Sequence, residues 1–338
     1  MKTFVKCLAV ILLLVSLQAT AQGARRVIID TDMGGDDAAA IILATKNPSI
    51  KIEGITVVSG NTNLEQAAKN ALMTLELTGT TAQVYKGAEK SFVGVDNDTS
   101  GVYGKDGMGD ANLIHPKASA NKKSAVDFIL ETVKVYPDEI EIILLGPATN
   151  VALAIDKDPV TMSRVKKFWS MGTAGFGQGN ATPVAEFNVY KDAEAYKILL
   201  DLGVPTTILG LDMATPDTFF SEETLADMKK RSPLNKFVAV ANGKCLDYSK
   251  QYLKQASIYA CDPLLMAAVV WSDFVLETEI CHASCMTDRN ETYGQVIFYR
   301  KNYSYDTMPT FDNYNVEVIT KIKSAEFVSR FIKTLDGM

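Results

Sequence analysis

The strongest constraint on the fold of this chain is the regular alternation of short apolar runs with helical patterns. Apolar runs typical of buried strands cover residues 27–30, 51–58, 140–145, 165–170 and 206–209, and helical patterns cover residues 36–46, 64–77, 124–136 and 192–202. Parallel strands need long crossover connections, which are usually helices. We therefore expect an α/β fold with a single-domain, Rossmann-like, mainly parallel sheet flanked by helices.

The second half of the chain changes character. Residues 221–256 have a helical and polar pattern, which predicts a cap over one end of the sheet. Two further strands are expected at 292–299 and 315–322, followed by a closing helix at 325–335. No internal repeat or Pro/Gly-rich linker divides the chain. One domain over residues 22–338 is the simplest organisation.

The first 21 residues have the pattern of a signal peptide. Lys2 and Lys6 precede an apolar run at 8–17, and Ala19-Thr20-Ala21 matches an A-x-A cleavage site. The apolar run is too short for a comfortable membrane span. We expect cleavage after Ala21, export to the periplasm or beyond, and no membrane association after cleavage.

Charge and cysteine content exclude other classes. The formal net charge of −6 argues against a nucleic-acid surface, which normally has a basic excess. Four cysteines follow the predicted leader: Cys245, Cys261, Cys281 and Cys285. Separate buried thiols are favoured, and a Cys281–Cys285 disulfide remains open. His282 is the only histidine near this pair, so a zinc site lacks ligands.

An acidic turn after the first predicted strand carries the most chemical information. Asp30, Asp32, Asp36 and Asp37 fall within eight residues, and two glycines between them allow a sharp turn. Ligand sites in open α/β sheets lie at this end of the strands. Four neighbouring carboxylates repel one another unless a cation neutralises them. Oxygen-only ligands suit Ca²⁺ or Mg²⁺.

Two other interpretations of the acidic turn fit less well. An EF-hand loop needs a glutamate at its twelfth position, where this chain has Ile41. A haloacid-dehalogenase-like phosphatase also has an Asp-x-Asp motif after a strand, but usually with Thr or Val at the position of Gly34. Its later Gly-Asp-x-x-x-Asp motif is missing, because Gly109-Asp110 leads to Ile114.

Six segments in order resemble the inosine-uridine nucleoside hydrolase family. The stretch Asp30–Ala38 resembles that family's Asp-x-Asp-Pro-Gly-x-Asp-Asp-Ala signature, with Met33 in place of proline. The other matching segments are Ser59–Asn61, Gly104–Gly109, Leu145–Asn150 and Gly179–Asn188, and Cys261–Leu264 follows them. The resemblance implies calcium-dependent hydrolysis of the N-glycosidic bond of ribonucleosides, which releases ribose and a free base.

The resemblance also implies roles for individual residues. Asp32, Asp37, Asp262 and the backbone carbonyl of Thr149 would bind calcium, and Asp32 would also be the general base that activates a metal-bound water. Asp30 would orient the turn from behind. The residues expected to hold the ribose hydroxyls are Asp36, Asn61, Asn180, Glu186 and Asn188.

The chain departs from the family where the base leaves. Cys261 stands where well-known members have a histidine that is credited with helping base departure, and Tyr103 replaces another histidine. A neutral Cys261 thiol is a weak proton donor or only fills space. Tyr248 and Tyr252, one helical turn apart, are alternative donors that would contact the substrate. These departures leave the preferred base open.

The expected partner is a small-molecule ribonucleoside rather than a nucleic acid, and we expect a homo-oligomer, a dimer or tetramer. A competing hypothesis is a non-catalytic exported nucleoside- or sugar-binding protein. Such a protein would be expected to have lost Asp32 or the pocket acids, and both are present.

Overall fold

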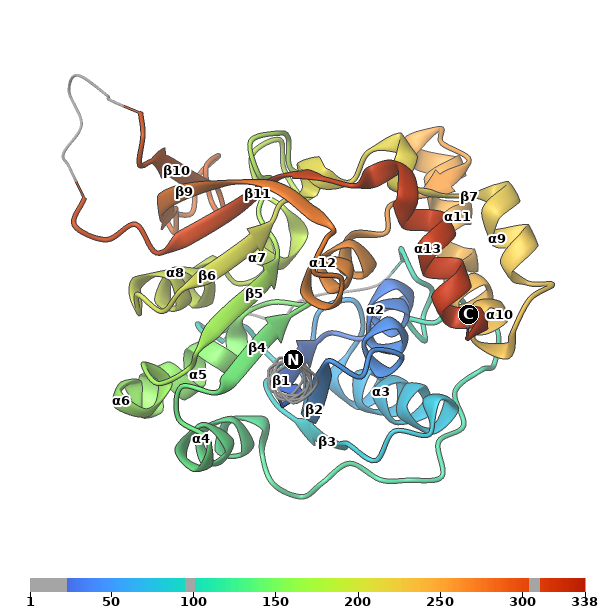
Figure 1. The fold of residues 1–338 in the computed structure, drawn as a ribbon, viewed down its shortest axis with the longest axis horizontal. Helices are drawn as coiled ribbons and strands as arrows, with labels where there is room; N and C mark the ends of the chain where they lie inside the picture. Colours follow the sequence, from blue (N-terminus) through green and yellow to red (C-terminus); the bar gives the residue numbers. More distant parts are fainter. Residues whose placement is uncertain (1–22, 95–100, 304–310, 338) are drawn as a thin grey trace, which may run out of the picture.

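A nine-stranded sheet forms the centre of the protein (Figure 1). The computed structural model describes residues 23–94, 101–303 and 311–337. The strand order is β10-β9-β11-β6-β5-β4-β1-β2-β3. The bounds are β1 Arg25–Thr31, β2 Ile50–Val57, β3 Gln83–Lys86, β4 Ile140–Leu144, β5 Lys167–Met171, β6 Thr206–Leu209, β9 Val275–Cys285, β10 Val296–Arg300 and β11 Val316–Ile322. Neighbours from β3 to β11 pair in parallel, and only β9 is antiparallel to its neighbours. The predicted mainly parallel α/β fold is confirmed.

Helices cover both faces of this sheet, and each face has its own hydrophobic core. The helices on one face are α2 (Gly35–Thr45), α3 (Leu64–Thr78), α10 (Pro233–Ala241), α12 (Cys261–Val270) and α13 (Ser324–Asp336). The helices on the other face are α4 (Ala125–Val135), α5 (Thr149–Lys157), α6 (Pro159–Met162) and α8 (Ala193–Asp201). All ten residues of α12 are buried. A helix that is apolar all round belongs inside a core, and α12 packs directly on α2.

The predicted cap consists of short helices rather than one polar helical segment. It contains α9 (Glu222–Met228), α10, α11 (Gly243–Tyr248) and a π-helical turn, η3 (Ser249–Leu253). The paired strands β7 (Phe220–Ser221) and β8 (Ser257–Ile258) flank these helices in the sequence. The polar interpretation is wrong for α10, because Leu234, Phe237 and Val238 are buried in the core. Its apolar face has the helical period, but the polar residues around it obscured that signal.

Two strands of the central sheet were not expected from the sequence. The short strand β3 lies at one edge, and β9 runs for eleven residues with several exposed positions. Cys281 and Cys285 both lie on β9 and are free, buried thiols. Four residues of extended strand separate their Cα atoms by about 13 Å, whereas a disulfide needs about 4.4–6.8 Å. Separate thiols are therefore confirmed.

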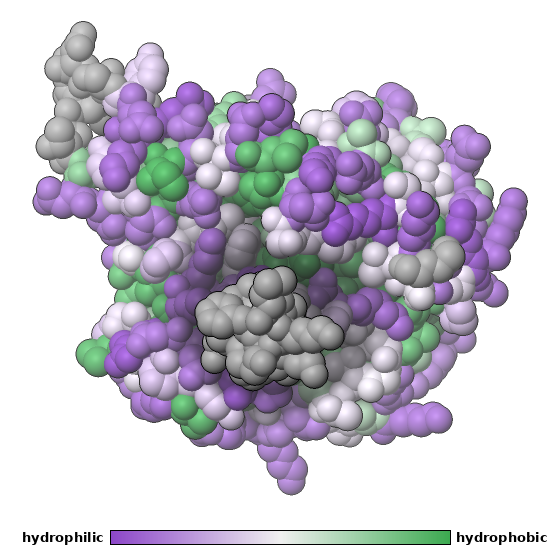
Figure 2. All heavy atoms as spheres, viewed as in Figure 1, coloured by the Kyte–Doolittle hydropathy of each residue, from purple (hydrophilic) through white to green (hydrophobic). Residues whose placement is uncertain are grey.

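The predicted signal peptide falls on residues 1–22, which lie outside the described residues. Within the part of the chain that the structure describes, we find no helix with the length and apolar character needed to cross a membrane. On the face shown in Figure 2, polar and charged side chains surround small, separate apolar groups.

Candidate active site

The acidic turn connects the carboxyl end of β1 to the amino end of α2. The Asp37 carboxylate folds this turn back on itself, because it accepts hydrogen bonds from the Gly34 backbone nitrogen (2.7 Å) and the Thr31 hydroxyl (2.5 Å). Met33 has a φ of 53°, in the left-handed region that proline cannot adopt. A proline at position 33 is therefore incompatible with this backbone. The Asn70 side chain donates to the Met33 carbonyl at 3.0 Å and holds the turn in place.

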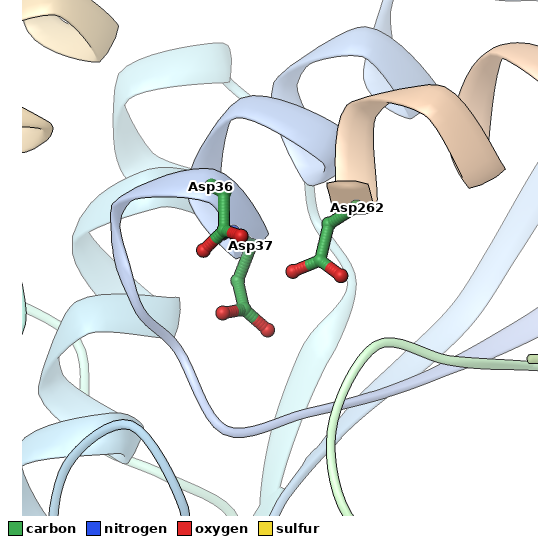
Figure 3. Close-up of side chains that lie close together, drawn as sticks. All are labelled: Asp36, Asp37 and Asp262. Atoms are coloured by element: carbon green, nitrogen blue, oxygen red, sulfur yellow. Dashed lines mark hydrogen bonds between the residues drawn. The ribbon is translucent and has the colours of Figure 1, made fainter. Parts of the chain in front are cut away.

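Three carboxyl groups converge at the amino ends of two helices (Figure 3). Asp36 and Asp37 lie in the first turn of α2, and Asp262 lies in the first turn of α12. One carboxylate oxygen from each lies within 4.8 Å of the others. Helix amino ends favour nearby negative charge, which offsets part of the repulsion. The packing of α12 against α2 therefore joins residues that are more than two hundred positions apart in the sequence.

Asp32 lies beside this group of three rather than within it. The Asn61 side-chain nitrogen donates to both Asp32 (3.1 Å) and Asp37 (3.2 Å), and the Asn61 backbone nitrogen donates to Asp32 at 2.6 Å. Two glycines allow the chain to approach this carboxylate. A Cβ atom on Gly60 would lie 2.0 Å from an Asp32 oxygen, and one on Gly146 would lie 3.0 Å from its carboxyl carbon.

The electrostatics of these buried carboxylates favour the binding of a cation. Burial, followed by the neighbouring carboxylates, raises the pKa values of Asp32 and Asp262 well above the ordinary range and that of Asp36 to about 7. Among the described residues, no lysine or arginine forms an ion pair with these side chains. Burying several carboxylates without a counter-charge is unfavourable. An all-oxygen donor set of this kind fits a hard divalent ion such as Ca²⁺.

Asp30 lies one layer behind the turn. It is fully buried and accepts hydrogen bonds from the Thr56 hydroxyl (2.5 Å) and the Asn150 side chain (2.8 Å). Asn150 also donates to the Val57 carbonyl and accepts from the Ala88 backbone nitrogen. Asp30 therefore ties β1 to β2 and to the first turn of α5.

A second wall of polar side chains comes from the loop after β5 and from α7 (Phe187–Lys191). Glu186 caps α7 by accepting from the Asn188 backbone nitrogen at 2.9 Å, and burial raises its pKa to about 7. The Asn188 side chain donates to the Leu145 and Met171 carbonyls at the ends of β4 and β5. The Asn180 side-chain oxygen accepts from the Phe187 backbone nitrogen at 2.9 Å.

These walls enclose a cavity of about 280 Å³. It is close in size to the smaller pockets that bind small molecules, which start at roughly 300 Å³. Its lining combines carboxylates and side-chain amides with aromatic side chains and two thiols. The lining residues are Asp36, Asn61, Val102, Tyr103, Leu145, Met171, Asn180, Ala181, Glu186, Phe187, Asn188, Cys245, Tyr248, Ser249, Leu253, Tyr259, Cys261 and Asp262.

Most of the predicted substrate-contacting residues line this cavity, but Tyr252 does not. Tyr252 is 61% exposed and packs on Tyr248, with ring centroids 4.8 Å apart, so only Tyr248 faces the cavity. Asp32 and Asp37 are fully buried behind the lining residues. Thr149 is also buried, and its hydroxyl donates to Asp192 at 2.6 Å.

Other residues of the site were missed or underrated from the sequence. Tyr103 hydrogen-bonds with Asp36 and with the Cys245 thiol, so it links the acidic turn to the cap. Cys245 was interpreted only as a buried thiol, yet it lines the cavity. From the sequence, Asn150 was only the last residue of a matching segment, and Asp192 was only the first residue of an expected helix. Their spacing carries no signal, because their partners lie on other elements.

Comparison with known proteins agrees with this geometry. Residues 27–329 match the family described as inosine-uridine preferring nucleoside hydrolase, and the chain belongs to this family. It is 35% identical to uridine nucleosidase 1 of Arabidopsis thaliana over 73% of this chain and 74% of that protein. It is 32% identical to the pyrimidine-specific ribonucleoside hydrolase of Escherichia coli over 61% of this chain and 65% of that protein.

Solved structures give the same result. A plant nucleoside hydrolase superposes with a TM-score of 0.86 at 27% identity, covering 93% of this chain and 99% of that chain. The purine-preferring ribonucleoside hydrolase of Gardnerella vaginalis superposes with a TM-score of 0.84 at 27% identity, covering 93% and 98%. The chain is therefore a nucleoside hydrolase that acts on small-molecule ribonucleosides, and the phosphatase and non-catalytic alternatives are set aside.

Proposed function

We propose that this enzyme hydrolyses the N-glycosidic bond of ribonucleosides in a calcium-dependent reaction in which Asp32 is the general base. One observation carries the proposal: the carboxylates of Asp36, Asp37 and Asp262 lie within 4.8 Å of one another, Asp36 and Asp262 line the cavity, and no described cation pairs with them. The acidic turn provides Asp36 and Asp37, α12 provides Asp262, and Asn61 donates a hydrogen bond to Asp37 of this cluster.

Calcium, when bound, would hold the ribose diol and lower the pKa of a nearby water. Asp37 and Asp262 are proposed ligands, together with Asp32 and the Thr149 carbonyl. Asp36 shares an oxygen cluster with two of these ligands, so it is a further candidate ligand besides its proposed contact with the sugar. The anomeric carbon develops oxocarbenium character as the base leaves, and Asp32 accepts the proton of the attacking water.

Different lining residues would bind the two parts of the substrate. Glu186, Asn188, Asn61 and Asn180 would bind the ribose hydroxyls. The base would lie against aromatic residues such as Tyr248. Neither histidine of the chain lines the cavity. Similarity to a uridine enzyme and to a purine-preferring one leaves the base undecided.

A substrate panel tests the proposal. The purified enzyme is incubated with purine and pyrimidine ribonucleosides and with 2′-deoxy analogues, and free ribose is measured with a chelator and after calcium is restored. We expect ribose release that the chelator stops and calcium restores, and much slower release from the deoxy substrates. Undiminished release in the chelator would refute the calcium part of the proposal while leaving the hydrolase activity intact.

We further propose that the chain is exported after cleavage behind Ala21. The supporting observation is the Lys-apolar-Ala-x-Ala pattern of the leader. The intact mass of protein recovered from the periplasm or medium should correspond to a chain that begins at Gln22. Recovery of the exported protein with Met1 retained would contradict it. The homo-oligomer also remains a prediction, which sedimentation analysis would test.

A further inference from the structure

Helix α5 begins behind the acidic turn, where its second residue, Asn150, donates to Asp30, and it lacks the usual capping side chain. Its N-cap residue is Ala148, which offers no side-chain hydrogen bond to the helix. A helix start without a cap is less stable by about 1 kcal/mol than one with Ser, Thr, Asp or Asn. Thr149, the first residue of α5, is the proposed carbonyl ligand for calcium, so its backbone has to be held by something else.

Side chains of the first two helical residues hold this turn from opposite sides. The Asn150 side chain reaches toward the sheet, where it donates to Asp30 at 2.8 Å and to the Val57 carbonyl at 3.1 Å. The Thr149 hydroxyl points the other way and donates to an Asp192 oxygen at 2.6 Å. The first turn of α5 is thus fixed at two successive residues by buried polar contacts.

Asp192 connects three segments of the chain: the start of α5, the loop after β3 and the start of α8. It is 0% exposed, and the oxygen that accepts from Thr149 also accepts from the Phe92 backbone nitrogen at 2.6 Å. Its other oxygen accepts from the Ala195 backbone nitrogen at 3.2 Å and caps α8. The residues just before it form α7, which carries Asn188. A buried carboxylate with three donors and no described ion-pair partner is a rigid joint rather than a surface cap.

A second contact reinforces this joint. The loop after β3 is held at two points by the starts of two helices, because the Ala88 nitrogen donates to Asn150 of α5 and the Phe92 nitrogen donates to Asp192, the N-cap of α8. The backbone at Gly87 also packs tightly against Asn150, because a Cβ atom at Gly87 would lie 1.9 Å from the Asn150 side-chain oxygen. Movement of Thr149 would therefore require rearrangement of β3's loop and of α8 together.

We propose that Asp192 is a positioning residue for metal binding: through the Thr149 hydroxyl it holds the Thr149 backbone carbonyl in place for the cation. This inference rests on the proposed function, in which that carbonyl is a ligand. Partners one layer behind metal ligands typically contribute tenfold to a hundredfold in metal affinity when they are removed. The effect acts on affinity for the ion rather than on the chemical step.

The decisive variants separate this role from helix capping. Asp192→Ser keeps a good N-cap for α8, but its shorter side chain cannot reach the Thr149 hydroxyl. Thr149→Val removes only that hydroxyl and leaves the backbone carbonyl present. Thr149→Ser restores the hydroxyl without the methyl group. Thr132→Val is the matched control, because the buried Thr132 hydroxyl donates to the Phe128 carbonyl within α4.

Calcium affinity is measured directly by competition with a chelating dye, and kcat and KM are measured at low and saturating calcium. We expect Asp192→Ser and Thr149→Val each to weaken calcium binding by roughly tenfold, and the double variant to be no weaker than the single ones. Thr149→Ser should recover most of the affinity. Saturating calcium should return kcat toward the wild-type value, and Thr132→Val should change only the melting temperature.

Three outcomes overturn the inference. Wild-type affinity in Asp192→Ser would mean that Asp192 only caps α8. Additive losses in the double variant would mean that the two residues act separately. A wild-type enzyme that hydrolyses nucleosides but binds no calcium would overturn the proposed metal dependence itself, and the inference with it. The first two results leave the proposed function untouched.

Discussion

Buried carboxylates lie at both ends of the parallel strands of the central sheet: the amino edge, where the strands begin, and the carboxyl edge, where they end. Their negative charge is neutralised differently at the two edges. At the amino edge, Glu141 of β4 is bound by Arg25, by Lys166 and by the Trp169 indole nitrogen. At the carboxyl edge, Asp36, Asp37 and Asp262 face one another, and no lysine or arginine of the described residues forms an ion pair with them. The first arrangement neutralises its charge within the chain, whereas the second leaves negative charge for an external ion.

The pKa values express this difference. Burial alone would raise the pKa of Glu141, but the Arg25 and Trp169 hydrogen bonds outweigh it and lower the value to about 2. Burial and carboxylate neighbours raise the pKa of Asp262 far above its ordinary range. Carboxylates that are perturbed upward and line a cavity are candidates for function, and satisfied ones belong to the architecture. The comparison can be tested at both edges.

The largest expected effect is on turnover. Asp32→Asn should lower kcat by about a thousandfold or more, because loss of a general base alone removes roughly 10²–10⁴ and Asp32 is also a proposed ligand. Glu141→Gln, the equivalent isosteric change at the amino edge, should leave kcat within twofold. Asn180→Ala should have a much smaller effect than Asp32→Asn. Near-normal turnover of Asp32→Asn at saturating nucleoside would eliminate its role as base.

Metal removal should have the next largest effect. A ligand at 100 times its Kd stabilises the folded state by about 2.7 kcal/mol, so calcium should raise the melting temperature of the chelator-treated enzyme by several degrees. Asp262→Asn should abolish most of this shift, and Glu141→Gln should retain it. An equal calcium shift in wild type and Asp262→Asn would place the ion elsewhere.

A smaller effect is expected at Cys261. Its thiol is buried beside Asp262, and burial together with the surrounding carboxylates raises its pKa well above the ordinary value. Such a thiol is a poor proton donor, so we expect Cys261→Ala to reduce hydrolysis of nucleosides and of p-nitrophenyl riboside by the same few-fold factor. A loss confined to the nucleosides would restore a leaving-group role, because the activated riboside needs little acid assistance.

The smallest effect on function, and a distinct effect on stability, is expected from Glu141→Gln. Because the pKa of Glu141 is lower in the folded than in the unfolded state, its stabilisation is complete above about pH 4.5 and disappears as the pH falls toward 2. We expect the variant to lose about 1–3 kcal/mol of unfolding free energy at pH 7. Denaturant unfolding at pH 7 and pH 3 should show a smaller difference at pH 3; a constant difference would contradict the assignment.

Much of the fold and part of the site followed from local patterns. Periodicity predicted most of the parallel strands and their helices to within a few residues, since each element's buried face repeats along its own sequence. It failed for β3 and β9. The first is a short edge strand, and the second is half exposed, so neither has a continuous apolar signal. The buried face of α10 was not recognised either, because polar residues surround its apolar positions in the sequence.

The sequence by itself determined the class of fold, the acidic turn after β1 and, through ordered motifs, the family. Only the tertiary structure decided that Asp36 shares the carboxylate cluster with Asp37 and Asp262, and that Tyr252 lies outside the cavity. It also brought Thr149 to Asp192, forty-three positions away. Such contacts depend on how α12 packs on α2 and how α5 meets α8. Those packings arise from long-range side-chain complementarity, which leaves no period in the local sequence.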